Sequence, residues 1–167
     1  MTVTIIENEV EDRYELIAKA FVTTNKLSKK DFIALAFETV FSLIPEAEKG
    51  SYYEIDGDYF EPIIAYGYDF ELLKELKFHK DKHFTDYFSP NKPDIDVYEV
   101  AIKQRSVSKL DSKTINILEQ LNTLKNFSTL FSPIKIGNEK VAVICLDNFS
   151  QNHFTQASKT ILKIYSQ

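Results

Sequence analysis

One segment, residues 140–147, constrains the fold more than any other part of the chain. It reads Lys-Val-Ala-Val-Ile-Cys-Leu-Asp, so six consecutive apolar residues lie between two charged ones. A short apolar run of this length is typical of a strand that is buried on both faces of a sheet. Residues 130–136 precede it, and Gly137 and Asn138 between the two segments favour a tight turn. We therefore expect a hairpin whose second strand is covered on both sides.

A second pair of strand signals lies earlier in the chain. Residues 50–56 and 59–66 are rich in β-prone side chains, and Asp56-Gly57-Asp58 between them favours a turn. Pro62 has no N–H to donate to a neighbouring strand, so we expect the returning strand to lie at an edge of the sheet. A weaker strand signal covers residues 96–103, where the side chains alternate in polarity.

Helix signals surround these strands. Apolar side chains lie near helical spacing over residues 2–24, and residues 28–44 begin with a capping-box pattern and end before a proline. The second of these helices is apolar nearly all round, so it needs burial on more than one side. Asp69, Asp111 and Thr155 can each cap a further helix, the last two over residues 111–125 and from residue 155 onward. An antiparallel sheet with helices on a face or at its ends is the α+β arrangement that buries such elements.

Composition limits the classes of function. The 167 residues suit one domain, and 20 basic against 25 acidic side chains give a net charge of −5, with an isoelectric point near 5.3. Such a chain lacks the basic surface that nucleic acid attracts, so we expect no nucleic-acid partner. Cys145 is the only cysteine, which suits a reducing compartment. No apolar run could span a bilayer and residues 1–12 lack a signal-peptide pattern, so we expect a cytoplasmic protein without membrane insertion.

Several short segments, in this order, resemble a GAF domain. They are residues 43–51 (Leu-Ile-Pro-Glu-Ala-Glu-Lys-Gly-Ser), 65–68 (Ala-Tyr-Gly-Tyr), 131–141 (Phe-Ser-Pro-Ile-Lys-Ile-Gly-Asn-Glu-Lys-Val), 146–148 (Leu-Asp-Asn) and 154–155 (Phe-Thr). The sequence of these segments is most similar to that of bacterial GAF domains that precede diguanylate cyclase (GGDEF) or other signalling output domains. The resemblance implies an α+β, PAS-related fold: a six-stranded antiparallel sheet with terminal helices packed on one face and a helical or loop lid on the other. A PAS-like domain is the alternative fold.

The resemblance also implies a division of the chain and a role. Residues 1–27 would form an N-terminal amphipathic helix that can serve dimerisation, and residues 28–167 a GAF-like domain whose last helix can lead to an output domain. The implied role is sensory or regulatory rather than enzymatic: the domain binds an unidentified small molecule, with the cofactor unknown, and relays its occupancy through the terminal helices. One alternative is a ligand-free dimerisation module of a signalling protein, and a less favoured one is an enzyme.

Some features depart from relatives with known ligands. Cyclic-nucleotide-binding relatives carry an Asn-Lys-x-x-Phe motif, whereas Asn148 is followed here by Phe149, which argues against a cyclic nucleotide. The methionine sulfoxide reductases of this fold need cysteine pairs, and the single Cys145 excludes their thiol exchange. Bilin attachment needs a cysteine near the helical lid, but Cys145 lies in an apolar strand segment.

Five residues are candidates for the ligand site. Glu54 would be a buried carboxylate aimed at the ligand if the strand face that it shares with Tyr52 lines the pocket, and a solvated side chain if that face is wet. Arg105 could hold a carboxylate or phosphate group of a ligand, or be an ordinary surface arginine. Aromatic side chains could form a pocket wall or belong to the core; these are Tyr66, Phe78 and Tyr98.

The terminal helices suggest a homodimer. Two copies that pack these helices together would bury apolar side chains that one copy leaves exposed. The candidates for this interface are Val10, Ile17, Val40, Phe41 and Leu162. The alternative is a monomer in which the apolar side chains of these helices are all buried against its own sheet.

No catalytic or metal-binding pattern is evident. His79 and His83 are four residues apart, which could begin a metal site on a helix, but the surrounding charges favour a solvated loop and we predict no metal. Ser106, Ser108 and Ser132 lack the glycines of a nucleophile elbow, and the chain has no glycine-rich phosphate loop. We therefore predict no catalytic residues.

Overall fold

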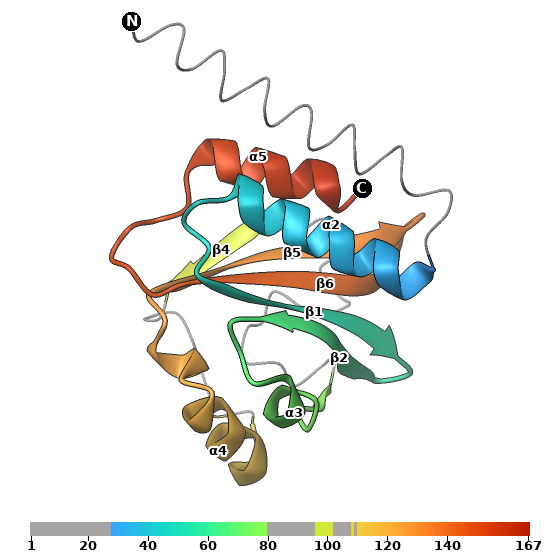
Figure 1. The fold of residues 1–167 in the computed structure, drawn as a ribbon. Helices are drawn as coiled ribbons and strands as arrows, with labels where there is room; N and C mark the ends of the chain where they lie inside the picture. Colours follow the sequence, from blue (N-terminus) through green and yellow to red (C-terminus); the bar gives the residue numbers. More distant parts are fainter. Residues whose placement is uncertain (1–27, 80–95, 102–107, 109) are drawn as a thin grey trace, which may run out of the picture. The chain divides into compact units, whose positions relative to one another are not determined.

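The computed structural model describes residues 28–79, 96–101, 108 and 110–167. The chain forms two compact units, Met1–Pro45 and Glu46–Gln167. The described part of the first unit is a helix, and the second unit holds a sheet with further helices (Figure 1). The helix expected over residues 2–24 lies outside the described residues.

Helix α2, Lys29–Leu43, begins and ends as the sequence predicts. The Ser28 hydroxyl oxygen accepts a hydrogen bond from the backbone N–H of Asp31 at 3.2 Å and donates one to the Asp31 carboxylate at 2.6 Å. This is the capping box with an aspartate in place of the usual glutamate. The helix ends at Leu43, and Pro45 follows two residues later.

The described strands form one antiparallel sheet of six strands in the order β3-β2-β1-β6-β5-β4. The strands are β1 Lys49–Asp56, β2 Tyr59–Tyr66, β3 Phe78–His79, β4 Tyr98–Ala101, β5 Ser128–Ile136 and β6 Glu139–Asn148. Strand β6 pairs with β1 on one side and with β5 on the other. The expectation of a covered strand over residues 140–147 is confirmed, because β6 is buried from Ala142 to Asn148.

The first hairpin is also confirmed, with one correction. Gly57 has φ +59° at the turn, a conformation that glycine adopts without strain. The predicted edge position of β2 is wrong, because β3 lies outside it. Pro62 is accommodated because the described pairing with β3 involves only Tyr59 and Phe60, and because the β1–β2 register shifts next to Pro62.

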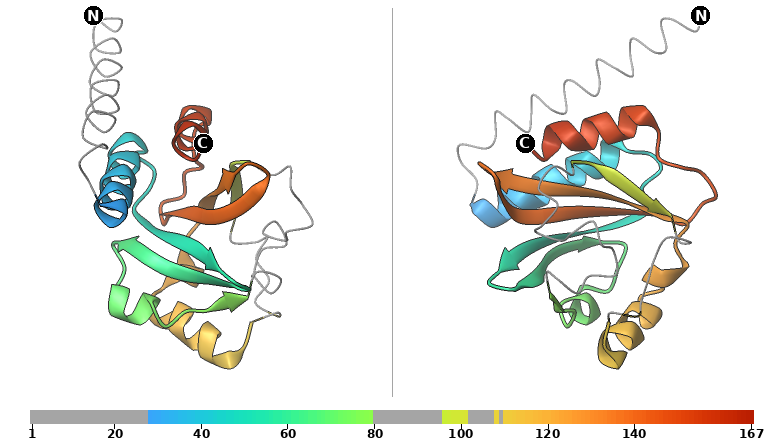
Figure 2. Two further views of the ribbon diagram at one scale, coloured as in Figure 1. Left: turned by 90° about the vertical axis from the view of Figure 1, so that its right-hand side faces the viewer. Right: turned by 180° about the vertical axis from the view of Figure 1, so that it is seen from behind.

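One face of the sheet carries the main hydrophobic core and the helices α3, Phe70–Leu73, and α4, Ser112–Gln120 (Figure 2). Asp69 and Asp111 cap these helices, as predicted. The buried side chains of this core are Tyr53, Phe60, Leu73, Leu76, Phe78, Val100, Ile117, Leu118, Leu121, Phe131, Val143 and Cys145.

The helix predicted over residues 111–125 is shorter than expected. It ends at Gln120, and a separate 3-10 turn, η4, covers Thr123–Lys125. Asn122 between them has φ +57°, a left-handed conformation that an α-helix cannot continue through.

Helix α5, Gln156–Tyr165, lies on the opposite face of the sheet from α3 and α4 (Figures 1 and 2). The Thr155 side chain caps it by accepting a hydrogen bond from the Ser158 N–H at 3.2 Å. Its Leu162 is fully buried, and the Ser166 and Ser132 hydroxyls form a hydrogen bond that joins the end of the helix to β5.

Candidate functional site

A small cavity lies on the core face of the sheet, beside α4. Its volume is about 20 Å³, which is the room that one water molecule needs. Both apolar and polar residues line it, with Phe78, Leu118 and Phe131 among the apolar ones. The remaining lining residues are Ser51, Tyr53, Thr123, Thr129, Cys145 and Asp147.

One of the lining residues, Asp147, is a buried carboxylate. Asp147 is only 3% exposed and lies near the end of β6. The Tyr68 hydroxyl donates to its Oδ2 at 2.6 Å, and the Asn126 side-chain amide donates to its Oδ1 at 2.6 Å. The Thr129 hydroxyl also donates to Oδ1. A carboxylate is tolerated at such depth only when donors of this kind surround it.

The same contacts fix the protonation state of Tyr68. Burial raises the pKa of its phenol, and the neighbouring Asp147 carboxylate raises it further. Tyr68 is therefore a neutral hydrogen-bond donor at physiological pH. This cluster is not among the sites predicted from the sequence. The one local signal for it is the charged residue, Asp147, that ends an apolar strand segment.

The five candidate ligand residues are not all gathered at this cavity. Phe78 lines it, and the ring of Tyr98 stacks on that of Phe131, another lining residue, with 5.3 Å between centroids. Tyr66 is 51% exposed, at the end of β2. Arg105 lies outside the described residues.

Glu54 lies in β1, one residue beyond the cavity-lining Tyr53. The Tyr52 hydroxyl donates a hydrogen bond to Glu54 Oε1 at 3.3 Å. Burial, and then the Glu54 carboxylate, raise the pKa of Tyr52 to about 12. Because successive strand residues point to opposite faces, Glu54 and Tyr52 face away from the side on which Tyr53 lines the cavity.

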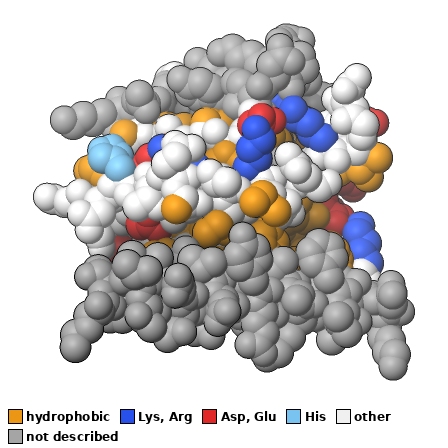
Figure 3. Space-filling view, turned by 90° about the horizontal axis from the view of Figure 1, so that it is seen from above, with side chains coloured by type: hydrophobic (Ala, Val, Ile, Leu, Met, Phe, Trp, Pro, Cys, Tyr) orange, Lys and Arg blue, Asp and Glu red, His pale blue; other side chains and the backbone are white. Residues whose placement is uncertain are grey.

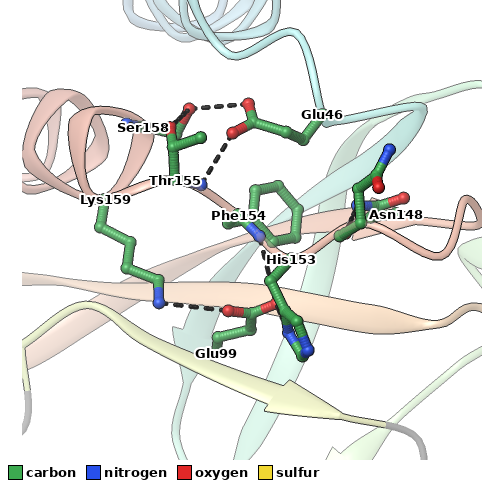
Figure 4. Close-up of polar contacts among 9 residues, drawn as sticks. Glu46, Glu99, Asn148, His153, Phe154, Thr155, Ser158 and Lys159 are labelled. Carbon is green, nitrogen blue, oxygen red and sulfur yellow. Dashed lines mark hydrogen bonds and ion pairs between the residues drawn. The ribbon is translucent and has the colours of Figure 1, made fainter.

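A second polar cluster surrounds the loop that leads into α5, on the other side of the sheet (Figure 4). Glu46 accepts hydrogen bonds from the Thr155 N–H and from the Ser158 hydroxyl, both at 2.7 Å. It thereby satisfies donors at the start of α5 that the helix itself leaves unpaired.

Glu48 holds the beginning of the same loop. Its Oε1 accepts hydrogen bonds from the backbone N–H groups of Phe149 at 3.1 Å and Ser150 at 2.8 Å, and from the Ser150 hydroxyl at 2.6 Å. Glu46 and Glu48 lie in the segment just before β1. Their hydrogen bonds therefore connect that segment to the β6–α5 loop.

A third glutamate, Glu99 of β4, reaches the same loop from the other side (Figure 4). It forms an ion pair with Lys159 Nζ at 3.1 Å and contacts His153 Nδ1 at 3.1 Å. It also accepts a hydrogen bond from the Phe154 N–H at 3.3 Å. We call Glu46, Glu48 and Glu99 the glutamate clasp.

The contacts of the glutamate clasp favour the ionised carboxylates. Partial burial raises the pKa of Glu46 and of Glu99, but hydrogen bonds outweigh it and lower both values. These come from Thr155 and Ser158 for Glu46, and from Ser128 of β5 and from Lys159 and His153 for Glu99. For Glu48, the hydrogen bond from the Ser150 side chain is the main cause of a lowered pKa. All three side chains are therefore acceptors at neutral pH.

The candidate dimer residues fall in different surroundings. Val40 and Leu162 are buried and Phe41 is half-buried, whereas Val10 and Ile17 lie outside the described residues. The view from above shows orange hydrophobic side chains on the surface among polar and charged ones (Figure 3). Ile164 of α5, 60% exposed, is a more accessible apolar residue than Leu162.

In the described part of the chain, no cluster of three or more His, Cys, Asp or Glu side chains is arranged to hold a metal ion. His79 contacts the Tyr59 ring. His83 lies outside this part of the chain. The helices that the structure describes include none with the length and hydropathy needed to cross a bilayer.

The architecture defines the class of fold. An antiparallel sheet of six strands, with α5 on one face and α3 and α4 over the core on the other, is the α+β fold of GAF domains. No family model and no curated protein matches the sequence, so the likeness comes from solved structures.

Three of these structures illustrate the likeness. The GAF domain of a phosphoenolpyruvate-protein phosphotransferase from Coxiella burnetii is 10% identical with a TM-score of 0.71, over 92% of this chain and 88% of that one. A GAF domain/HD domain protein from Geobacter sulfurreducens is 16% identical with a TM-score of 0.63, over 82% and 86%. The chromophore-binding domain of a bacteriophytochrome from R. palustris is 12% identical with a TM-score of 0.69, over 94% and 58%.

Proposed function

We propose that this chain is a sensory or regulatory domain that binds a small molecule beside Asp147 and relays its occupancy through α5 to a signalling output. The observation that carries the proposal is the Asp147 cluster, a polar group buried beside a cavity on the face opposite α5. Buried polar groups next to an apolar wall are the means by which pockets fix the orientation of a ligand.

The structural neighbours support a role of this kind. They include domains of two-component sensor histidine kinases and the chromophore-binding domains of bacteriophytochromes. In this proposal the domain is regulatory rather than catalytic, works in the cytoplasm and forms a homodimer. A diguanylate cyclase is one output that it could control.

The mechanism is a shift of population between two arrangements of the domain. A ligand can bias such an equilibrium only by binding one arrangement more tightly than the other. Because the cavity has a volume of only about 20 Å³, a ligand larger than a few atoms must displace lining side chains. Displacement of the cavity wall is thus the event that distinguishes the occupied state.

The same small volume favours a second candidate function, a ligand-free dimerisation module. In that case the Asp147 cluster would only hold α4 and η4 against the sheet, and the cavity would contain water.

Native mass spectrometry of freshly purified protein separates the two functions, because one spectrum reports both the subunit number and any retained small molecule. Extra mass that is lost on denaturation, and that is also lost in the Asp147→Asn variant, supports the sensor. The Tyr59→Phe variant, changed at an exposed side chain, is the control and should keep the extra mass. A dimer without extra mass, and without stabilisation by any compound of a metabolite panel in thermal unfolding, supports the dimerisation module.

A further inference from the structure

Strand β4 has side chains on both faces of the sheet. One face is turned to the core that contains the cavity, and the other is turned to α5. Tyr98 and Val100 point to the core face, where Val100 is buried and the Tyr98 ring stacks on Phe131 at 5.3 Å and an interplanar angle of 18°. Phe131 lines the cavity. Glu99, between them in sequence, points to the other face and holds the loop and first turn of α5.

Three of the contacts of Glu99 are made where α5 begins. Its side chain is only 10% exposed and contacts His153, the Phe154 N–H and Lys159 within 3.3 Å (Figure 4). A second ion pair, between Asp96 and Lys163 at 3.0 Å, links the segment just before β4 to α5, but both of its side chains are about half exposed. Exposed pairs contribute little, so Glu99 provides the stronger link.

The position of β4 in the sheet leaves it less constrained than the central strands. It has four residues and lies at the edge of the described sheet, paired with β5. An internal strand such as β6 is held by a neighbour on each side. A displacement of Phe131 therefore meets less resistance through Tyr98 and β4 than through the centre of the sheet.

We infer that Glu99 is the residue through which a displacement of the cavity wall reaches α5. When Phe131 moves, the stacked Tyr98 ring moves with it, and β4 carries Glu99 along. The Glu99 carboxylate then shifts or releases Lys159 and the Phe154 N–H. The biological meaning of this coupling rests on the proposed sensory function, but the coupling is a property of the folded chain and needs no ligand.

Hydrogen–deuterium exchange of the full chain tests the inference by a double-mutant cycle. Phe131→Leu perturbs the cavity wall, and Glu99→Gln weakens the link while keeping the size of the side chain. The readout is the exchange rate of α5 amides divided by that of β6 amides, so that a loss of global stability cancels. We expect Phe131→Leu to raise this ratio about fivefold in the parent chain but by less than about twofold in the Glu99→Gln background.

Two controls match these changes. Leu118→Val perturbs the same cavity from α4 and should leave the α5 ratio within about twofold of the parent. Glu46→Gln loosens the start of α5 from the β1 side and should leave the effect of Phe131→Leu intact. If Phe131→Leu prevents folding, Tyr98→Leu replaces it, because it removes the same stacked contact.

An equal effect of Phe131→Leu with and without Glu99 would overturn the inference, as would no effect on α5 in the parent chain. The proposed function fails separately. A protein that shows the coupling but never retains a small molecule contradicts the sensor alone, and one that retains a ligand without the coupling contradicts this inference alone.

Discussion

The Tyr68 hydroxyl donates a hydrogen bond of 2.6 Å to the carboxylate of Asp147, a residue 79 positions further along the chain. The contact joins the segment after the first hairpin to the last strand of the sheet, inside the domain. Asp147 is 3% exposed, so the charge depends on its donors.

Removal of this donor should destabilise the fold. In Tyr68→Phe one carboxylate oxygen of Asp147 loses a hydrogen bond, and we expect the free energy of unfolding to fall by ~2 kcal/mol, measured by urea unfolding. Tyr59→Phe removes a hydroxyl from a half-exposed side chain and should change it by less than about 0.5 kcal/mol. Equal stabilities for the two variants would contradict this account of Asp147.

The glutamate clasp predicts how stability depends on pH. The folded state lowers the pKa of all three carboxylates, for which the ordinary value is 4.5, so below that value the unfolded chain binds more protons. The contribution of the glutamate clasp to the free energy of unfolding should be complete above pH 4.5. It should be lost as the pH falls through the lowered pKa values of the folded state.

Urea unfolding at a series of pH values measures this dependence. The Glu46→Gln, Glu48→Gln double variant should be less stable than the parent at neutral pH, by less than about 1 kcal/mol for each partly exposed side chain, and should approach it in acid. Glu139→Gln, at an exposed position that begins β6, is the control. A difference between parent and double variant that stays constant with pH would exclude the clasp as its source.

Two glycines with positive φ should respond differently to alanine. Gly57 has φ +59° and open space around it, so Gly57→Ala should lower the unfolding free energy by ~1 kcal/mol through backbone strain alone. At Gly67, φ is +75° and an added Cβ would lie 2.8 Å from Lys49 Cγ. Displacement of Lys49 would also weaken its contacts with the Tyr68 and Phe149 rings, 5.0 and 5.1 Å from its Nζ.

Gly67→Ala should therefore destabilise by ~1 kcal/mol more than Gly57→Ala, as measured by thermal unfolding. Equal losses of stability in the two variants would mean that the Lys49 side chain can move away from the added Cβ without a cost in stability.

Cys145 offers a probe of the cavity, because it is the single thiol of the chain and it is buried beside Asp147. In the folded protein a thiol reagent should react at least about 100-fold more slowly than in concentrated urea, since reaction needs opening of the core. Absorbance of the released reagent follows the rate. Comparable rates in both conditions would show that the core face is open to solvent.

The proposed dimer can be tested on α5. Ile164→Glu places a charge on an exposed apolar position and should convert a dimer that uses α5 into a monomer, measured by light scattering during gel filtration. Ile136→Glu changes another exposed isoleucine, at the β5–β6 turn, and should leave the subunit number unchanged. A folded Ile164→Glu dimer would remove α5 from the interface.

The sequence by itself determined the hairpins, the caps and the central strand. These features depend on local sequence. Gly57 adopts the positive φ of a turn without strain, Asp69 and Asp111 accept hydrogen bonds from nearby N–H groups, and the apolar residues of β6 are stable only when buried. It misjudged the edge position of β2, because whether another strand lies outside Pro62 depends on a remote segment.

Only the tertiary structure decided the polar clusters. Tyr68, Asn126 and Asp147 are far apart in the sequence, and so are Glu46, Glu99 and α5. Nothing in the local pattern around an aspartate or glutamate distinguishes a buried acceptor from a solvated charge, because the donors that stabilise it come from other elements. The alternation of Tyr98 and Glu99 across β4 could be read from the sequence, but what each of them touches could not, because that depends on how the sheet and helices pack.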